Sequence, residues 1–341
     1  MKAQIKPSYD AKRRKLADII PLDTPFTVYI EPTRYCNFKC FYCMHATRGE
    51  KNGALEKTGL DIKHMPFNMY EKILEQLSRF PQRIKRIVFS GLGEPLIYPE
   101  LPKMVEYAKK TDIFERVDII TNASVLSREK SDALIKAGLS RILISVQGLG
   151  SEKYREVCGV SQDINELVEN IRYFYENRKN CSVFVKIIDA ILSGKEEEEK
   201  FFDMFGNICD SIYVEHLITL EQQMGDHNGL ADNRRNLNNQ TYEESDICPV
   251  IFYHININAD GDVFPCPVPG LPKSFSLGNI KEDELKSIWN GNRRKNLIRE
   301  HLKLNRKNIG ICKSCVTYAC INDSNERLDE YADGLLHLFE S

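Results

Sequence analysis

Short runs of valine and isoleucine recur along the first two thirds of the chain, and segments with helical periodicity separate them. Residues 68–77 and 127–136 repeat apolar side chains every three to four positions, and Gly138 ends the second segment just before the next run. Six strand–helix repeats predict a parallel sheet covered by helices, either closed like a barrel or open. The predicted strands are residues 26–30, 84–90, 117–121, 141–146, 183–188 and 212–217.

This pattern ends after about residue 218. Residues 229–240 are polar and rich in asparagine, which predicts a long loop, either a linker or a cover over an active site. Asp260-Gly261 lies between alternating residues, which predicts a β-hairpin over 254–264. Helices are expected near 282–289 and 293–307, and the charged run 195–200 is typical of a solvated helix face.

Composition narrows the functional classes. The chain has 341 residues, 42% of them hydrophobic, which fits a globular protein with a sizeable core. Its formal net charge of -2 argues against a general binder of nucleic acid. No segment has the apolar length of a signal peptide or a membrane span, so we expect a cytoplasmic protein without a membrane partner.

The eleven cysteines gather at two places. Cys36, Cys40 and Cys43 form a Cys-x3-Cys-x2-Cys loop directly after the first predicted strand, where α/β folds place their active sites. A 4Fe–4S cluster normally takes four thiolates, so three ligands leave one iron open to bind a reactant. The alternative is a zinc site with His45 as fourth ligand, in a protein of a different, non-catalytic class.

The segment from Cys36 to Cys43, with the aromatic Tyr42 before its last cysteine, resembles the signature loop of the radical S-adenosylmethionine (SAM) superfamily. Ser90-Gly-Leu-Gly-Glu-Pro95 resembles the glycine-rich segment with which that family binds the amino group of SAM. The resemblance implies a partial (β/α)6 TIM-like barrel and reductive cleavage of SAM to a 5′-deoxyadenosyl radical, with flavodoxin or ferredoxin as electron donor. The SAM contacts that it implies are Tyr42, Gly91, Gly93, Glu94, Thr121, Asn122, Ser145, Gln147 and Lys186.

Four later cysteines surround the predicted hairpin and the helix that follows it. By spacing alone they fit zinc or a 4Fe–4S cluster equally well. Cys248-Pro, Asn258–Cys266 and Cys312-Lys-Ser-Cys315 resemble the SPASM/twitch extension of radical SAM enzymes, which carries auxiliary clusters. This chain has fewer cysteines than the full SPASM pattern, which implies one auxiliary 4Fe–4S cluster. The implied ligands are Cys248, Cys266, Cys312 and Cys315.

Cys320 is then left over as a structural thiol, an alternate ligand or a hydrogen-atom donor. The expected organisation is an N-terminal extension over residues 1–25, a radical SAM core over 26–220, a polar loop over 221–247 and an auxiliary-cluster domain with a C-terminal tail over 248–341.

The chemistry implied by this layout leaves several substrates open. An auxiliary cluster with four protein ligands implies electron transfer, so the expected reaction is dehydrogenation of a sugar-like small molecule. Epimerisation and modification of a peptide are the alternatives; the small molecule is favoured because only residues 1–25 precede the core. Glu215 and His216, or less strongly His227, are candidate bases, unless they are surface caps. Cys158 is a candidate hydrogen donor or, alternatively, a buried core thiol.

Overall fold

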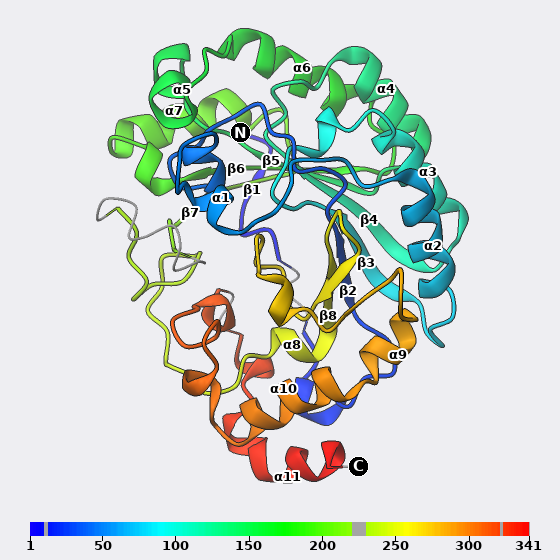
Figure 1. Cartoon of the computed structure of the whole chain (residues 1–341). Coiled ribbons are helices and arrows are strands. Elements are labelled where there is room, and N and C mark those ends of the chain that lie inside the picture. The colour runs from blue at the N-terminus through cyan, green and yellow to red at the C-terminus, as the bar shows by residue number, and fades with distance from the viewer. Residues whose placement is uncertain (10–12, 220–229, 321–322, 341) are drawn as a thin grey trace.

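A computed structural model describes residues 1–9, 13–219, 230–320 and 323–340, and Figure 1 shows the whole arrangement. The strands are β1 (Gln4–Ile5), β2 (Thr27–Ile30), β3 (Ile84–Phe89), β4 (Phe114–Thr121), β5 (Arg141–Ser145), β6 (Ser182–Ile188), β7 (Ser211–Glu215), β8 (His254–Ile257), β9 (Asp262–Phe264) and β10 (Gly278–Asn279). The α-helices are α1 (Ala54–Lys57), α2 (Phe67–Leu77), α3 (Leu101–Lys110), α4 (Arg128–Ala137), α5 (Ser151–Cys158), α6 (Ile164–Asn177), α7 (Lys195–Phe205), α8 (Val250–Tyr253), α9 (Leu285–Trp289), α10 (Asn292–Leu302) and α11 (Ala332–Leu336).

The six predicted strands are β2 to β7, and they lie side by side in chain order. Each neighbouring pair is parallel, and the full sheet runs β1-β7-β6-β5-β4-β3-β2-β8-β9-β10. Helices α2 to α7 cover the outer face of this curved sheet (Figure 1). The predicted α/β fold is confirmed as a partial barrel, because the two ends of the described sheet are not paired with each other.

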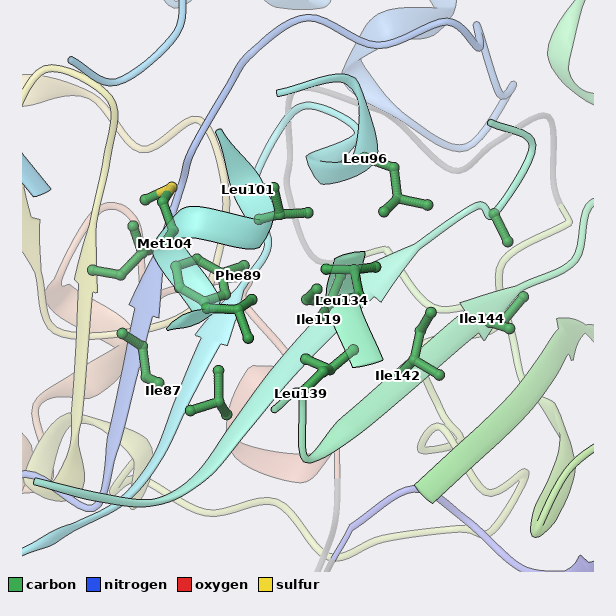
Figure 2. Packing of buried hydrophobic residues seen from close by; sticks show 14 of the residues in the cluster. Ile87, Phe89, Leu96, Leu101, Met104, Ile119, Leu134, Leu139, Ile142 and Ile144 are labelled. Carbon is green, nitrogen blue, oxygen red and sulfur yellow. The ribbon is translucent and has the colours of Figure 1, made fainter. Parts of the chain in front are cut away.

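The outer face of the sheet carries the core. Side chains alternate along a strand, so every second residue points to the same face. Ile87 and Phe89 on β3 and Ile142 and Ile144 on β5 are fully buried and face the helical layer. Figure 2 shows their contacts with leucines and a methionine of the covering elements. The same alternation leaves the other face of the strands, with its polar residues, for the barrel interior.

The predicted hairpin is present as β8 and β9, but it does not form a sheet of its own. β8 pairs in parallel with β2, with Val28 opposite Ile255, and β9 pairs antiparallel with β8. The C-terminal cysteine region therefore continues the barrel sheet on the side of β2 (Figure 1). The sequence analysis did not predict this pairing.

The N-terminal extension and the polar loop are the two remaining expected segments, and the structure describes each of them in part. At the opposite edge, β1 pairs in parallel with β7, so part of the N-terminal extension joins the sheet. Within the predicted polar loop, residues 230–240 form turns with one isolated bridge between Arg235 and Thr241. His227 and the rest of 220–229 lie outside the described residues. Across the parts of the chain that are described, no helix combines the length and apolarity that a membrane span requires.

Candidate active site and cluster sites

The loop with the first three cysteines leaves β2 and packs against the end of α5. The backbone N–H of Lys39 donates to the carbonyl of Cys158, and that of Phe41 donates to the carbonyl of Val157, both at 2.9 Å. The carbonyl of Cys40 accepts from the N–H of Cys43 at 2.9 Å. These bonds give the segment a fixed curve, as a loop must have if its cysteines are to reach one cluster.

The three thiols of this loop influence one another. Burial raises the pKa of Cys36 to about 12; the backbone of Phe38 lowers it, and Glu94, Cys43 and Cys40 raise it further. Within the described residues, no three His, Cys, Asp or Glu side chains converge closely enough for a single metal ion.

The glycine-rich segment after β3 lies directly on the cluster loop. A Cβ atom on Gly93 would meet the carbonyl oxygen of Thr33 at 2.3 Å, and one on Gly91 would meet Cγ of Glu31 at 2.6 Å. Both positions therefore require glycine because of space. The N–H of Glu94 donates to the carbonyl of Tyr35 at 2.8 Å, which adds a direct bond between the two segments.

Glu94 connects the end of β3 to the end of β4. Its carboxylate accepts from the hydroxyl of Thr121 at 2.5 Å, from the N–H of Asn122 at 2.7 Å and from the N–H of Leu96 at 2.9 Å. Burial raises its pKa, although these donors act against the rise. An ionised carboxylate has about four acceptor sites, so Glu94 keeps capacity for one further donor such as an ammonium group.

The predicted polar positions at the ends of β4 and β5 take part in two local networks. The amide of Asn122 donates to the side chain of Asn37 in the cluster loop at 3.1 Å, a partner that sequence reasoning missed. The hydroxyl of Tyr42 donates to the side chain of Gln147, whose amide donates to the carbonyl of Ser145 at 3.1 Å. The structure thus gathers these predicted SAM contacts around the three cysteines.

Lys186 and Glu215 form an ion pair across neighbouring strands. Nζ of Lys186 lies 2.5 Å from Oε2 of Glu215, and the Glu215 side chain is only 8% exposed. The predicted anionic partner of the lysine is therefore this carboxylate. The structure thus joins two predicted site residues, on β6 and β7, in one largely buried ion pair.

His216 has a different environment from its neighbour. Its Nδ1 lies 2.5 Å from Oδ2 of Asp189, and its Nε2 lies 3.0 Å from the carbonyl oxygen of Asp232. Its backbone N–H also donates to the carbonyl of Leu237 at 2.9 Å. Because both ring nitrogens are engaged, His216 anchors the loop after β7 and has no nitrogen left for a substrate.

Cys158 lies behind the cluster loop and is fully buried. Its thiol donates to the carbonyl of Tyr154 at 3.0 Å. A hydrogen bond with Cys158, followed by burial, raises the pKa of Cys40 well above its usual value. These contacts favour a core thiol that supports the loop over a hydrogen donor to a substrate.

A buried ionic network joins the cluster loop to the C-terminal hairpin. Arg34 is fully buried; its Nε donates to Glu31 at 2.7 Å, and its Nη1 donates to Asp260 in the hairpin turn at 2.7 Å. Glu31 also accepts from the N–H groups of Leu92 and Ala259, both at 3.1 Å. Sequence reasoning missed this network, although charged residues directly before the cysteines were a signal for it.

Asp260 has a second cationic partner in this network, the ammonium group of Lys63. Burial alone raises the pKa of Asp260, but hydrogen bonds from Lys63 and Arg34 outweigh burial and hold the pKa below its ordinary value. The hairpin turn therefore stays charged at neutral pH. Its charge fixes the turn against the segment that carries the first three cysteines.

The four predicted auxiliary ligands line one cavity. Cys248 precedes α8, Cys266 follows β9, and Cys312 and Cys315 lie in the segment after α10. Burial raises the pKa of Cys248 well above its usual value, and the other three thiols raise it further. Four thiols around a hollow of about 150 Å³ fit a cluster that fills the space between them.

Cys320 lies beside this cavity. Its thiol donates to the carbonyl of Val316 at 3.7 Å. Burial raises its pKa, and the charges of Cys315 and Glu215 raise it further. Of the three roles considered for Cys320, this position is compatible with a hydrogen donor and with a structural thiol.

Comparisons with known proteins agree with this arrangement. Residues 30–204, more than half of the chain, match the radical SAM superfamily, and residues 248–316 match the iron–sulfur cluster-binding domain SPASM. A probable GTP 3′,8-cyclase of Methanococcus vannielii is 35% identical over 127 residues. That match covers 37% of this chain and 38% of the relative, so it spans little more than a third of the relative's length.

Solved structures extend the likeness over most of the chain. Streptococcus suis SuiB bound to S-adenosylmethionine aligns with a TM-score of 0.59 at 20% identity, over 89% of this chain and 74% of SuiB. BtrN in complex with AdoMet and 2-DOIA aligns with a TM-score of 0.53 at 18% identity, over 85% of this chain and 92% of BtrN. The chain therefore belongs to the radical SAM superfamily, whose cofactors are SAM and a 4Fe–4S cluster, and carries a SPASM domain for auxiliary Fe–S binding.

Proposed function

We propose that this enzyme dehydrogenates a sugar-like small molecule. Cys36, Cys40 and Cys43 hold the 4Fe–4S cluster that binds SAM, and Cys248, Cys266, Cys312 and Cys315 hold one auxiliary 4Fe–4S cluster. When bound, the first cluster and SAM supply a 5′-deoxyadenosyl radical, formed together with methionine. The observation that supports oxidation is the cavity lined by four thiols, which leaves no ligand position for a substrate.

In this proposal the protein positions the substrate and accepts the proton and the electron that the substrate loses. With SAM and its cluster bound, the site would supply the chemistry that removes a hydrogen atom from the carbon that bears a hydroxyl group. Glu215 would then accept the proton of that hydroxyl group, and a cluster held by the four later cysteines would accept the second electron of the oxidation. Lys186 holds that carboxylate in place at 2.5 Å. The product is then a ketone, and a flavodoxin or ferredoxin is the proposed donor of the electron that SAM cleavage requires.

The proposal of a small molecule follows the likeness to BtrN, and the peptide alternative follows the likeness to SuiB. BtrN, whose structure contains the small molecule 2-DOIA, aligns over 92% of its length. SuiB, which is also known bound to its precursor peptide SuiA, aligns over 74% of its length. Native anSMEcpe with bound AdoMet and Cp18Cys peptide aligns over 96% of its length, so alignment length alone does not separate the small-molecule proposal from the peptide alternative.

The test uses anaerobically purified protein loaded with iron and sulfide. With dithionite and SAM it should release 5′-deoxyadenosine, and Cys36→Ala should abolish that release. With a panel of aminocyclitols, wild type should form one ketone for each 5′-deoxyadenosine, whereas Cys266→Ala should release 5′-deoxyadenosine without ketone.

Three other outcomes would each favour a different function. An unoxidised product that contains deuterium from deuterated water would replace dehydrogenation by epimerisation. Turnover of a short peptide encoded beside the gene, with none of the aminocyclitols consumed, would favour the peptide alternative. A colourless protein that contains zinc but neither iron nor sulfide would refute the radical chemistry.

A further inference from the structure

One buried arginine binds the backbone at three points around the auxiliary site. Arg306 begins the short 3-10 turn after α10 and is only 3% exposed. Its Nη1 donates to the carbonyl oxygens of Cys312 at 2.8 Å and Cys315 at 3.3 Å. Its Nε donates to the carbonyl of Ser245 at 3.0 Å, three residues before Cys248. One side chain thus holds the segments that carry three of the four thiols.

Among the described residues no carboxylate forms an ion pair with Arg306, although the charge of Arg306, after that of Lys307, helps to lower the pKa of Glu244. The three bonded oxygens are neutral carbonyls, and its guanidinium carbon lies 4.1 Å from the ring centroid of Tyr318. Arg306 also lines the same cavity as the four thiols. A buried charge without a counter-charge is costly, so such groups are normally paired or neutralised. An anionic group in the cavity would compensate the charge of Arg306 at close range.

His301, whose side chain contacts the backbone of Cys248, adds no charge to the auxiliary site. His301 is fully buried; its Nδ1 accepts from the N–H of Cys248 at 3.1 Å. An Nδ1 that accepts a hydrogen bond carries no proton, so the imidazole is neutral in this arrangement. Lys307, the next residue, is exposed and pairs with Glu244 at 2.7 Å. Arg306 is therefore the buried cation that lines the auxiliary cavity.

We propose that Arg306 is a positioning residue that supplies the counter-charge of the auxiliary cluster and raises its reduction potential. Four thiolates give a 4Fe–4S cluster a net negative charge, and reduction adds one more unit. A buried cation is screened only weakly, so it stabilises the reduced form more than the oxidised form. Net charge and hydrogen bonding around a cluster are established determinants of its potential.

This inference rests on the proposed function, because a higher potential makes the auxiliary site a better acceptor for the electron of a substrate radical. Its test, however, needs no substrate. The full chain, with Cys36, Cys40 and Cys43 replaced by alanine, is loaded with iron and sulfide so that the auxiliary cluster is the only one present. Its potential is then measured by redox titration monitored by electron paramagnetic resonance.

Three variants separate charge from hydrogen bonding. Arg306→Gln removes the charge, Arg306→Lys keeps the charge but loses the planar fork, and Lys307→Gln removes an exposed charge one residue away as the control. Arg306→Gln should lower the ratio of reduced to oxidised cluster at a fixed potential at least tenfold, which equals 59 mV for one electron. Arg306→Lys should keep most of the wild-type ratio, and Lys307→Gln should keep all of it.

Whether each Arg306 variant binds the auxiliary cluster gives the second readout. If Arg306→Gln binds no cluster while Arg306→Lys does, charge is required and the proposal stands. If neither variant loads, or if both load and have the wild-type potential, Arg306 is only a structural clamp and the proposal is overturned. A failure to oxidise any aminocyclitol would refute the proposed function but leave the measured potentials unaffected.

Discussion

Replacing Arg34 by methionine tests the buried network between the cluster loop and the hairpin. Arg34→Met keeps a similar apolar volume and removes a guanidinium that is fully buried. The variant leaves Glu31 and Asp260 without the cation that lies 2.7 Å from each of them. Removal of one partner from a buried ion pair costs about 3–5 kcal/mol, because the remaining charge stays uncompensated.

This cost can be converted into a melting temperature. The entropy of unfolding is about 2.1 cal/mol/K per residue, which gives about 0.7 kcal/mol/K for a chain of 341 residues. A loss of about 3–5 kcal/mol then lowers the melting temperature by about 4–7 °C. Differential scanning calorimetry of the metal-free full chain measures this change without any contribution from the clusters.

The control is Lys63→Met, which removes the other cation that contacts Asp260. The Lys63 side chain is 37% exposed, so solvent screens its ion pair and the loss should be about 1 kcal/mol or less. The expected shift in melting temperature is then below about 2 °C. Equal shifts for Arg34→Met and Lys63→Met would refute the view that burial makes the Arg34 contacts decisive.

Two further predictions concern binding and pH. The resemblance implies that Lys186, besides its ion pair with Glu215, donates a hydrogen bond to SAM. Lys186→Met should then weaken SAM binding about tenfold or more in equilibrium dialysis, because a charged hydrogen bond contributes about 1.5–3 kcal/mol. Lys195→Met on the exposed start of α7 should bind SAM normally, and equal affinities of Lys186→Met and wild type would exclude Lys186 from the SAM site. Asp260 has a lowered pKa, so its contribution to stability is present above its unfolded pKa of about 3.9 and is lost as the pH falls through its lower folded pKa. In urea titrations the deficit of Asp260→Asn should therefore shrink below about pH 4, and a deficit that is constant with pH would contradict this assignment.

The strands and their order could be predicted because each lies in a local run of apolar residues. The local sequence pattern did not predict the strand pairs that join segments far apart in the chain. β1 has only two residues, and its partner β7 lies about 200 residues later. The hairpin itself was evident from Asp260-Gly261, but its parallel pairing with β2 depends on how the C-terminal segment folds back onto the barrel.

The candidate site shows the same difference between local sequence patterns and contacts between distant segments. Cysteine spacing predicted which residues gather, because cluster loops carry their ligands close together in sequence. Spacing could not show that His216 is engaged by Asp189, or that Arg34 meets Asp260 across 226 positions of the chain. Both contacts are made between side chains on different elements, and single residues of these types carry no periodic signal.

The pairing of β8 with β2 also has a consequence for electron transfer. β2 leads into the loop of Cys36, while the hairpin that begins with β8 leads to Cys266, and the two strands share one hydrogen-bonded ladder. Rotation of the C-terminal region as a separate lobe would break that ladder and expose the apolar edge of β2. The spacing between the two proposed clusters is therefore set by the sheet, and the rate at which electrons pass between them cannot be gated by a hinge between domains.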